Sequence, residues 1–69
     1  MKVKLYEAVF TKNGGKKVKL SFTASNKNEA IDHADWVAVM DNYADHTTPA
    51  YLGWVPAEDF NKIPAFTDL

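Results

Sequence analysis

Residues 18–24 alternate strictly, with apolar side chains at the even positions and polar side chains at the odd positions. This period of two predicts a β-strand with one buried face. Residues 3–11 are apolar on both faces, which is typical of a central strand that is covered on both sides. Between the two strands, Asn13-Gly14-Gly15 suits a tight turn because Asn and Gly accept positive φ angles. Residues 1–25 are therefore predicted to form a β-hairpin.

The apolar spacing changes to that of a helix after residue 25. Asn26 is a good N-cap, Glu29 follows three residues later as in a capping box, and Thr47-Thr48-Pro49 ends the pattern. We therefore predict a helix over residues 26–45. One helix face carries mostly small residues that suit packing on a sheet: Ala30, Ile31, Ala34, Val37, Ala38 and Ala44. A second apolar stripe consists of Trp36, Val39, Met40 and Tyr43.

Residues 50–55 read as a third, short strand that ends at Pro56, and residues 57–60 fit a single helical turn after that proline. Residues 56–69 are predicted to be a turn and a C-terminal extended tail. The order of elements predicts one α+β domain over residues 1–69, with a ββαβ topology. We expect a three-stranded antiparallel sheet with the helix packed on one face, the first strand in the centre and the third strand beside it.

The size and composition of the chain narrow the classes of function. A chain of 69 residues buries a small core, which leaves little room for a deep substrate cleft. It contains no cysteine, so disulfides and thiolate metal sites are excluded. No apolar run approaches the roughly 20 residues that span a bilayer, and Met1 is followed by strand-like residues rather than by a signal peptide. We expect a cytoplasmic protein with no membrane contact.

No group of residues forms a recognisable catalytic or metal site. No second histidine shares a helical face with His33, and His46 lies just past the end of the predicted helix. Gly14-Gly15 opens no helix and so forms no phosphate loop. The serines and threonines lie in no turn typical of a nucleophile. We therefore predict a protein that is not an enzyme and that uses neither a cofactor nor a metal.

The two halves of the chain carry opposite charge. Residues 1–28 contain seven lysines and one acid, whereas residues 29–69 contain eight acids and one lysine, which gives +6 and −7 and the net charge of −1. A nucleic-acid-binding protein is one alternative, with the hairpin lysines on phosphates and Tyr6 or Phe10 stacking on bases. The chain has no arginine, the residue that recognises phosphate or guanine in bidentate fashion, and this weighs against that alternative.

The second helix stripe favours a protein-binding module, because Trp, Tyr and Met are enriched in interface cores. We predict partner contacts at Trp36, Met40, Tyr43, Tyr51 and Trp54. We expect electrostatic steering from Lys12, Lys16, Lys17 and Lys19. Two other interpretations stay open: the stripe is covered by Phe60, Ile63 and Phe66 of the tail, or it joins two copies of the chain in a homodimer or a small self-assembling structural protein.

The run Glu29-Ala30-Ile31-Asp32-His33-Ala34-Asp35-Trp36 and the order of elements resemble the bacteriophage T7 type of small inhibitors of host RNA polymerase, over about residues 5–38. The resemblance implies a phage protein that inhibits a host enzyme in the bacterial cytoplasm, either RNA polymerase or a defence complex. In that family a basic pair on the last strand contacts the polymerase. Residues 51–55 contain no basic residue, so the resemblance implies a host protein as the target but not that particular contact.

Overall fold

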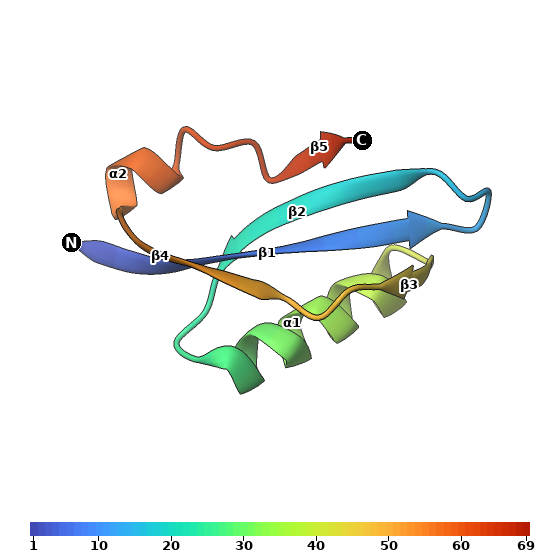
Figure 1. The fold of residues 1–69 in the computed structure, drawn as a ribbon, viewed down its shortest axis with the longest axis horizontal. Coiled ribbons are helices and arrows are strands. Elements are labelled where there is room, and N and C mark those ends of the chain that lie inside the picture. Colours follow the sequence, from blue (N-terminus) through green and yellow to red (C-terminus); the bar gives the residue numbers. More distant parts are fainter.

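The computed structural model describes residues 1–69 as an α+β fold with one main helix on a five-stranded antiparallel sheet. In chain order the elements are β1 (Lys2–Lys12), β2 (Lys17–Thr23), α1 (Lys27–Met40), β3 (Tyr43–His46), β4 (Ala50–Pro56), α2 (Ala57–Phe60) and β5 (Phe66–Asp68). α1 lies on one side of the sheet and α2 on the other (Figure 1). The predicted α+β class is confirmed.

β1 is the central strand, as its two apolar faces predict. β2 pairs with one edge of β1, and β4 and β3 follow one another along the other edge. β4 lies opposite residues 2–7 of β1, β3 lies opposite residues 10–12, and β5 extends the sheet beyond β2. The prediction that the strand near residues 50–55 lies beside the first strand is confirmed.

Local signals place the hairpin turn and the start of α1. The backbone N–H of Gly15 donates to the Lys12 carbonyl at 2.8 Å, and Gly15 adopts a φ of 88°, which only glycine accepts easily. The Asn26 side chain accepts a hydrogen bond from the Glu29 N–H at 2.9 Å, and the Glu29 carboxylate accepts one from the Ser25 N–H at 3.1 Å. The predicted turn and helix cap are both confirmed.

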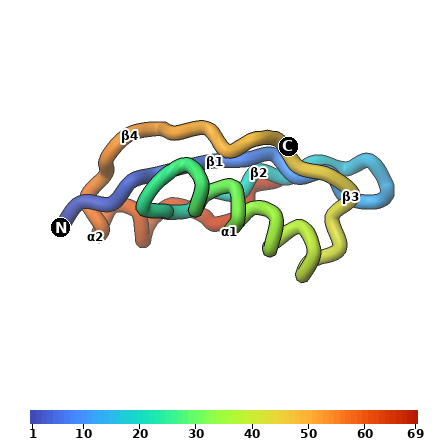
Figure 2. The backbone as a smooth tube through the Cα atoms, turned by 90° about the horizontal axis from the view of Figure 1, so that it is seen from below, coloured from blue at the N-terminus to red at the C-terminus, as the bar shows by residue number.

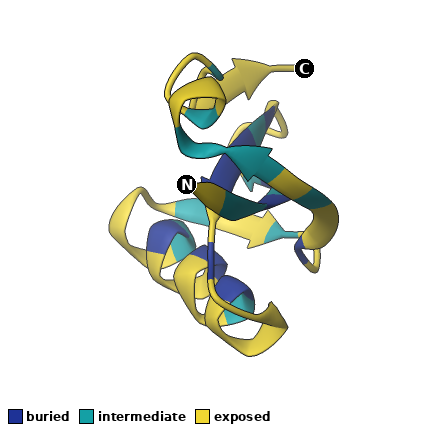
Figure 3. Ribbon diagram, turned by 90° about the vertical axis from the view of Figure 1, so that its left-hand side faces the viewer, coloured by how far each residue is buried: buried dark blue, intermediate teal, exposed yellow.

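The main core lies between the sheet and α1, on what we call the inner face of the sheet. Ten buried residues form it: Tyr6, Ala8, Phe10, Val18, Leu20, Phe22, Ala24, Ala30, Ala34 and Val37. The helix contributes small residues, Ala30 and Ala34, so its backbone lies close to the aromatic rings of the strands. Figure 3 shows the buried side of α1 turned toward the sheet, and Figure 2 shows α1 running along the length of β1 and β2.

The helix ends earlier than predicted. α1 stops at Met40, and Asn42 adopts a left-handed conformation with a φ of 57°. Asparagine tolerates this conformation and often follows the last residue of a helix. The following Tyr43–His46 segment, which we predicted to be helical up to residue 45, forms β3 instead. The Tyr43 ring packs on the ring of Phe10 with centroids 5.1 Å apart, a tertiary contact that the helical spacing does not indicate.

The sheet has five strands rather than three, and the C-terminal segment is not an extended tail. The predicted helical turn at residues 57–60 is present as α2, and residues 66–68 then pair with Val18–Leu20 of β2 as strand β5. The Ser21 N–H also donates to the Ala65 carbonyl at 2.8 Å. Three residues are too few to show an alternating pattern, so the pairing with β2 defines this strand.

Candidate functional site

Two of the five predicted contact residues lie one turn apart on the exposed side of α1. The side chains of Trp36 and Met40 are each 60% exposed, and Val39 between them is 75% exposed. The small residues of the opposite helix face fill the space against the sheet, so these three larger apolar residues remain in solvent. Large apolar side chains gathered on one surface mark a protein-binding site more often than single ones do. We call Trp36, Val39 and Met40 the α1 patch.

Tyr43 belongs to the core rather than to the α1 patch. It is half-buried against Phe10, and its ring centroid lies 6.5 Å from that of Phe66 in β5. Burial raises the pKa of Tyr43, with the carboxylates of Asp41 and Asp68 adding to the effect. β5 brings Phe66, which is 45% exposed, to the inner face of the sheet. The tail therefore lies close to Tyr43, while the α1 patch remains exposed.

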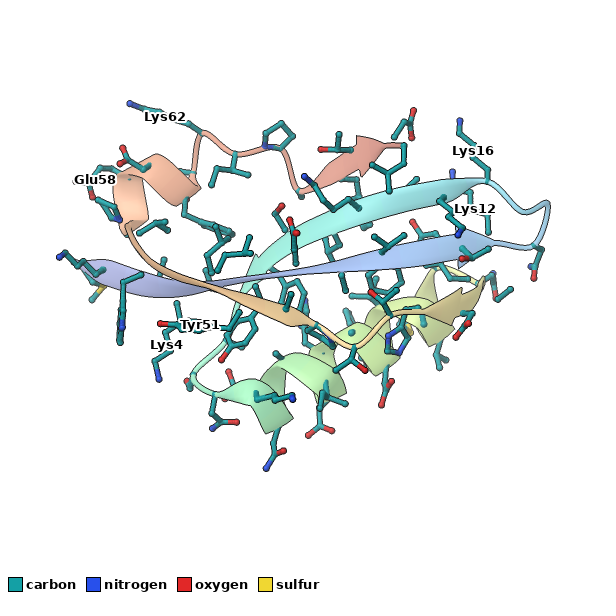
Figure 4. All side chains as sticks on the ribbon, in the orientation of Figure 1. Lys4, Lys12, Lys16, Tyr51, Glu58 and Lys62 are labelled. Atoms are coloured by element: carbon teal, nitrogen blue, oxygen red, sulfur yellow. The ribbon has the colours of Figure 1, made fainter.

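The other two predicted contact residues, Tyr51 and Trp54, lie on β4. The Tyr51 ring packs on that of Tyr6 with centroids 5.3 Å apart, and Lys4 Nζ lies 5.3 Å from the centre of the Trp54 ring. Their exposed fractions are 51% and 58%. Figure 4 shows Tyr51 between β4 and the first half of α1, with Lys4 beside it.

A β-bulge puts both aromatic residues on the same side of the sheet. Residues three apart on a regular strand point to opposite faces. In β4, Tyr51 lies opposite Tyr6 and Gly53 lies opposite Leu5, so Leu52 is an extra residue that has no partner on β1. Gly53 adopts a φ of 103° at this bulge. Trp54 consequently faces the same side as Tyr51, which is the α1 side.

A shallow cleft of about 390 Å³ lies beside Trp54. It is lined by Lys2, Val3, Lys4, Thr23, Ala24, Ser25, Glu29 and Trp54. The Lys4 ammonium already donates to the Ser25 carbonyl at 2.9 Å, so its charge ties β1 to the start of α1. None of the three residues of the α1 patch lines this cleft, so the two sites are separate.

The predicted steering lysines do not surround the α1 patch. Lys12 and Lys16 lie beside the hairpin turn, at the end of the molecule away from Lys4 (Figure 4). Lys17 and Lys19 alternate with the buried residues of β2 and so face away from α1, on what we call the outer face. Lys19 lies 3.7 Å from Glu7, and Lys16 lies 3.8 Å from Asp68. The acids of the helix nearest the α1 patch are Asp32 and Asp35, whereas Lys4 and Lys27 lie at the start of α1.

One ion pair, which no local sequence pattern predicts, joins α1 to β3. His46 Nδ1 donates to the Thr47 carbonyl at 2.8 Å, and His46 Nε2 lies 2.6 Å from the Asp35 carboxylate. Both partners only accept hydrogen bonds, so this geometry favours the doubly protonated ring. Burial opposes this charge most strongly, but the hydrogen bonds and the carboxylates of Asp35 and Asp45 outweigh it and raise the pKa of His46 above 6.5.

Comparison with protein-family models, with curated proteins and with solved structures gives no match to the chain. The phage-inhibitor interpretation therefore rests on the sequence resemblance over about residues 5–38 and stays a prediction. No helix combines the length and the apolar character needed to cross a lipid bilayer. No three residues among the histidines, aspartates and glutamates are grouped so that they could hold a metal ion.

The nucleic-acid alternative loses its stacking residues in the structure. Tyr6 is 4% exposed and Phe10 is fully buried, so neither ring is available to a base. Two of the four hairpin lysines are already paired with carboxylates. No feature of the structure favours this alternative over protein binding.

Proposed function

We propose that the chain is a protein-binding domain and that the α1 patch is the centre of its binding surface. The observation that carries the proposal is the exposure of Trp36, Val39 and Met40 on a helix whose opposite face is fully packed. Burying such side chains contributes about 1.5–3 kcal/mol each, which is enough for a few residues to dominate an interface.

The two free edges of the sheet fit protein binding less well than the helix does. β4 is interrupted by the bulge at Leu52 and Gly53, and bulged edges pair poorly with another strand. β5 has only three residues, and Lys16 and Asp68 form an ion pair beside it. Strand addition is therefore a weaker mode here than docking on the exposed side of α1.

The resemblance supplies a target class, a bacterial host enzyme, and that class is part of the proposal. Site-specific photocrosslinking tests it in bacterial lysate. A photoreactive amino acid replaces Val39 in one variant and Thr67, on the opposite side of the sheet, in a second. We expect one protein, identified by mass spectrometry, to crosslink from position 39 and not from position 67.

A further variant, Trp36→Ala with Met40→Ala, should abolish the crosslink from position 39. Both side chains are exposed, so the double variant should still fold, which circular dichroism and thermal unfolding would verify. Equal crosslinking from positions 39 and 67, or none from position 39, would show that the α1 patch is not a binding surface.

A further inference from the structure

The charge around the α1 patch indicates which kind of protein surface fits it. Asp32 and Asp35 lie one turn before Trp36 and Val39 on the same exposed helix surface. The chain contains no lysine or arginine between residues 28 and 61. The α1 patch is therefore an apolar strip with carboxylates along its border.

The positive charge of the molecule lies away from the α1 patch: Lys27 begins α1, and Lys2 and Lys4 line the cleft beside the start of that helix. Lys17 and Lys19 project from the outer face, and Lys12 and Lys16 lie beside the hairpin turn. One of the two acids beside the α1 patch is held by another group: Asp35 accepts a hydrogen bond from the His46 imidazolium. Asp32 forms no hydrogen bond or ion pair within the chain, so its carboxylate is free to meet a cation.

We infer that the α1 patch binds a basic amphipathic segment of a partner protein, with apolar side chains on Trp36, Val39 and Met40 and a lysine or arginine on Asp32. This inference rests on the proposed function and adds the sign of the partner's charge. Opposite charges around an apolar centre raise the association rate and exclude acidic partners. An acidic partner would place its carboxylates against Asp32 and Asp35 and would be repelled.

Two synthetic helical peptides of about 18 residues test the charge sign. Both carry leucines on one face; the polar face carries lysines in one peptide and glutamates in the other. Binding to the full-length, isotope-labelled chain is followed by NMR. We expect the leucine–lysine peptide to shift the amide signals of residues 32–41 and to bind at least about tenfold more tightly than the leucine–glutamate peptide.

Matched variants locate the electrostatic contribution. Asp32→Asn keeps the shape of the side chain and should weaken binding of the lysine peptide by about two- to fivefold at low salt. Lys17→Gln on the outer face should leave its affinity unchanged or slightly higher. Trp36→Ala should weaken both peptides. Added salt should reduce the difference between wild type and Asp32→Asn.

Equal affinity for the two peptides, no binding of either, or signal shifts outside residues 32–41 would overturn the inference. So would a salt-sensitive dimer of the chain itself, because a second copy would then supply the lysines. If the crosslink from position 39 still identifies a partner while the lysine peptide fails, protein binding stands and only the charge assignment falls.

Discussion

The two faces of the sheet differ in how they are covered and in how much apolar surface they bury. The inner face is sealed by α1 over a cluster of ten buried residues. On the outer face, Leu5 and Ser21 are buried, but the lysines of β2 remain partly in solvent. Leu5 is buried without joining the inner cluster, and α2 contacts β1 on this side of the sheet, so the burial on the outer face is much smaller.

α1 also explains why the candidate binding surface lies on its side of the molecule. The helix meets the sheet through alanines, which bring the backbone close and leave the larger side chains of the helix on the far side. The bulge in β4 then turns Tyr51 and Trp54 to the same side. The inner side thus holds both the most buried and most of the exposed aromatic residues, whereas the outer face holds the positive charge of β2.

The largest effect should come from deleting a side chain of the inner core. Phe10→Ala removes a fully buried ring that packs on Tyr43 and His46, and it should lower the free energy of unfolding by about 3–5 kcal/mol. A domain of this size is stable by only about 3–10 kcal/mol, so the variant should lose a large fraction of its stability and unfold at a much lower urea concentration.

Val9→Ala is the matched control, because Val9 is the neighbouring, half-buried residue on the outer face of the same strand. It should cost about 1 kcal/mol in urea unfolding. Equal losses for the two variants would contradict the division into a main inner core and a smaller outer one.

The bulge in β4 should give the next largest effect. Gly53→Ala forces a residue with a Cβ to adopt a φ of 103°, which should cost about 1–3 kcal/mol, although no atom lies near enough to clash. The strain should also disturb the pairing of Trp54 with Lys4, which a shift in the Trp54 indole NMR signal would report. Gly14→Ala is the control: Gly14 has no positive φ and no close neighbour, so the free energy of unfolding should change by less than about 0.5 kcal/mol.

Most of the fold could be predicted from local pattern, and most of the errors concern segments whose structure depends on distant residues. The alternation of residues 18–24, the capping box at Asn26 and the turn at Gly15 are short-range signals, and each is confirmed. β3 and β5 are strands only because they pair with β1 and β2. The end of α1 is the exception, because Asn42 is a local signal for it: asparagine favours the left-handed conformation that follows many helices.

The site was predicted in part for the same reason. Helical spacing is enough to group Trp36, Val39 and Met40, because their exposure depends on one helix packing through its small residues. The face on which Tyr51 and Trp54 lie depends on the bulge, and the partner of His46 lies eleven residues earlier on another element. The opposite charges of the two sequence halves do not indicate where the lysines lie relative to the α1 patch; the strand alternation turns Lys17 and Lys19 to the outer face.

The helix cap should give a smaller effect that is specific to α1. Asn26→Ala removes the acceptor of the Glu29 N–H and should lower the free energy of unfolding by about 1 kcal/mol. Asn28→Ala changes an exposed residue in the same turn that makes no side-chain hydrogen bond, and it should be neutral or slightly stabilising. The loss of protection from hydrogen exchange should be confined to the amides of α1, because α2 has no side-chain cap to lose. A loss of protection in α2 that matches the loss in α1 would contradict this assignment.

The smallest effect should be a dependence of stability on pH that comes from His46. Its pKa is raised in the folded protein, with burial as the largest and opposing contribution, outweighed by the bonds to Thr47 and Asp35 and by the charges of Asp35 and Asp45. The extra stability is therefore fully present below the unfolded pKa of 6.5 and is lost as the pH rises through the higher folded pKa. Because the Asp35 side chain is 62% exposed, solvent screening keeps the change small.

Urea midpoints measured between about pH 6 and 9 should fall with rising pH in the wild type and become flat in His46→Gln. Lys19→Gln, which removes the outer-face pair with Glu7 at 3.7 Å, should keep the wild-type slope, because a lysine does not titrate in this range. A slope that persists in His46→Gln would assign the pH dependence to another group. A slope of the opposite sign in the wild type would mean that burial of the ring outweighs its two hydrogen bonds and that His46 is neutral in the folded protein.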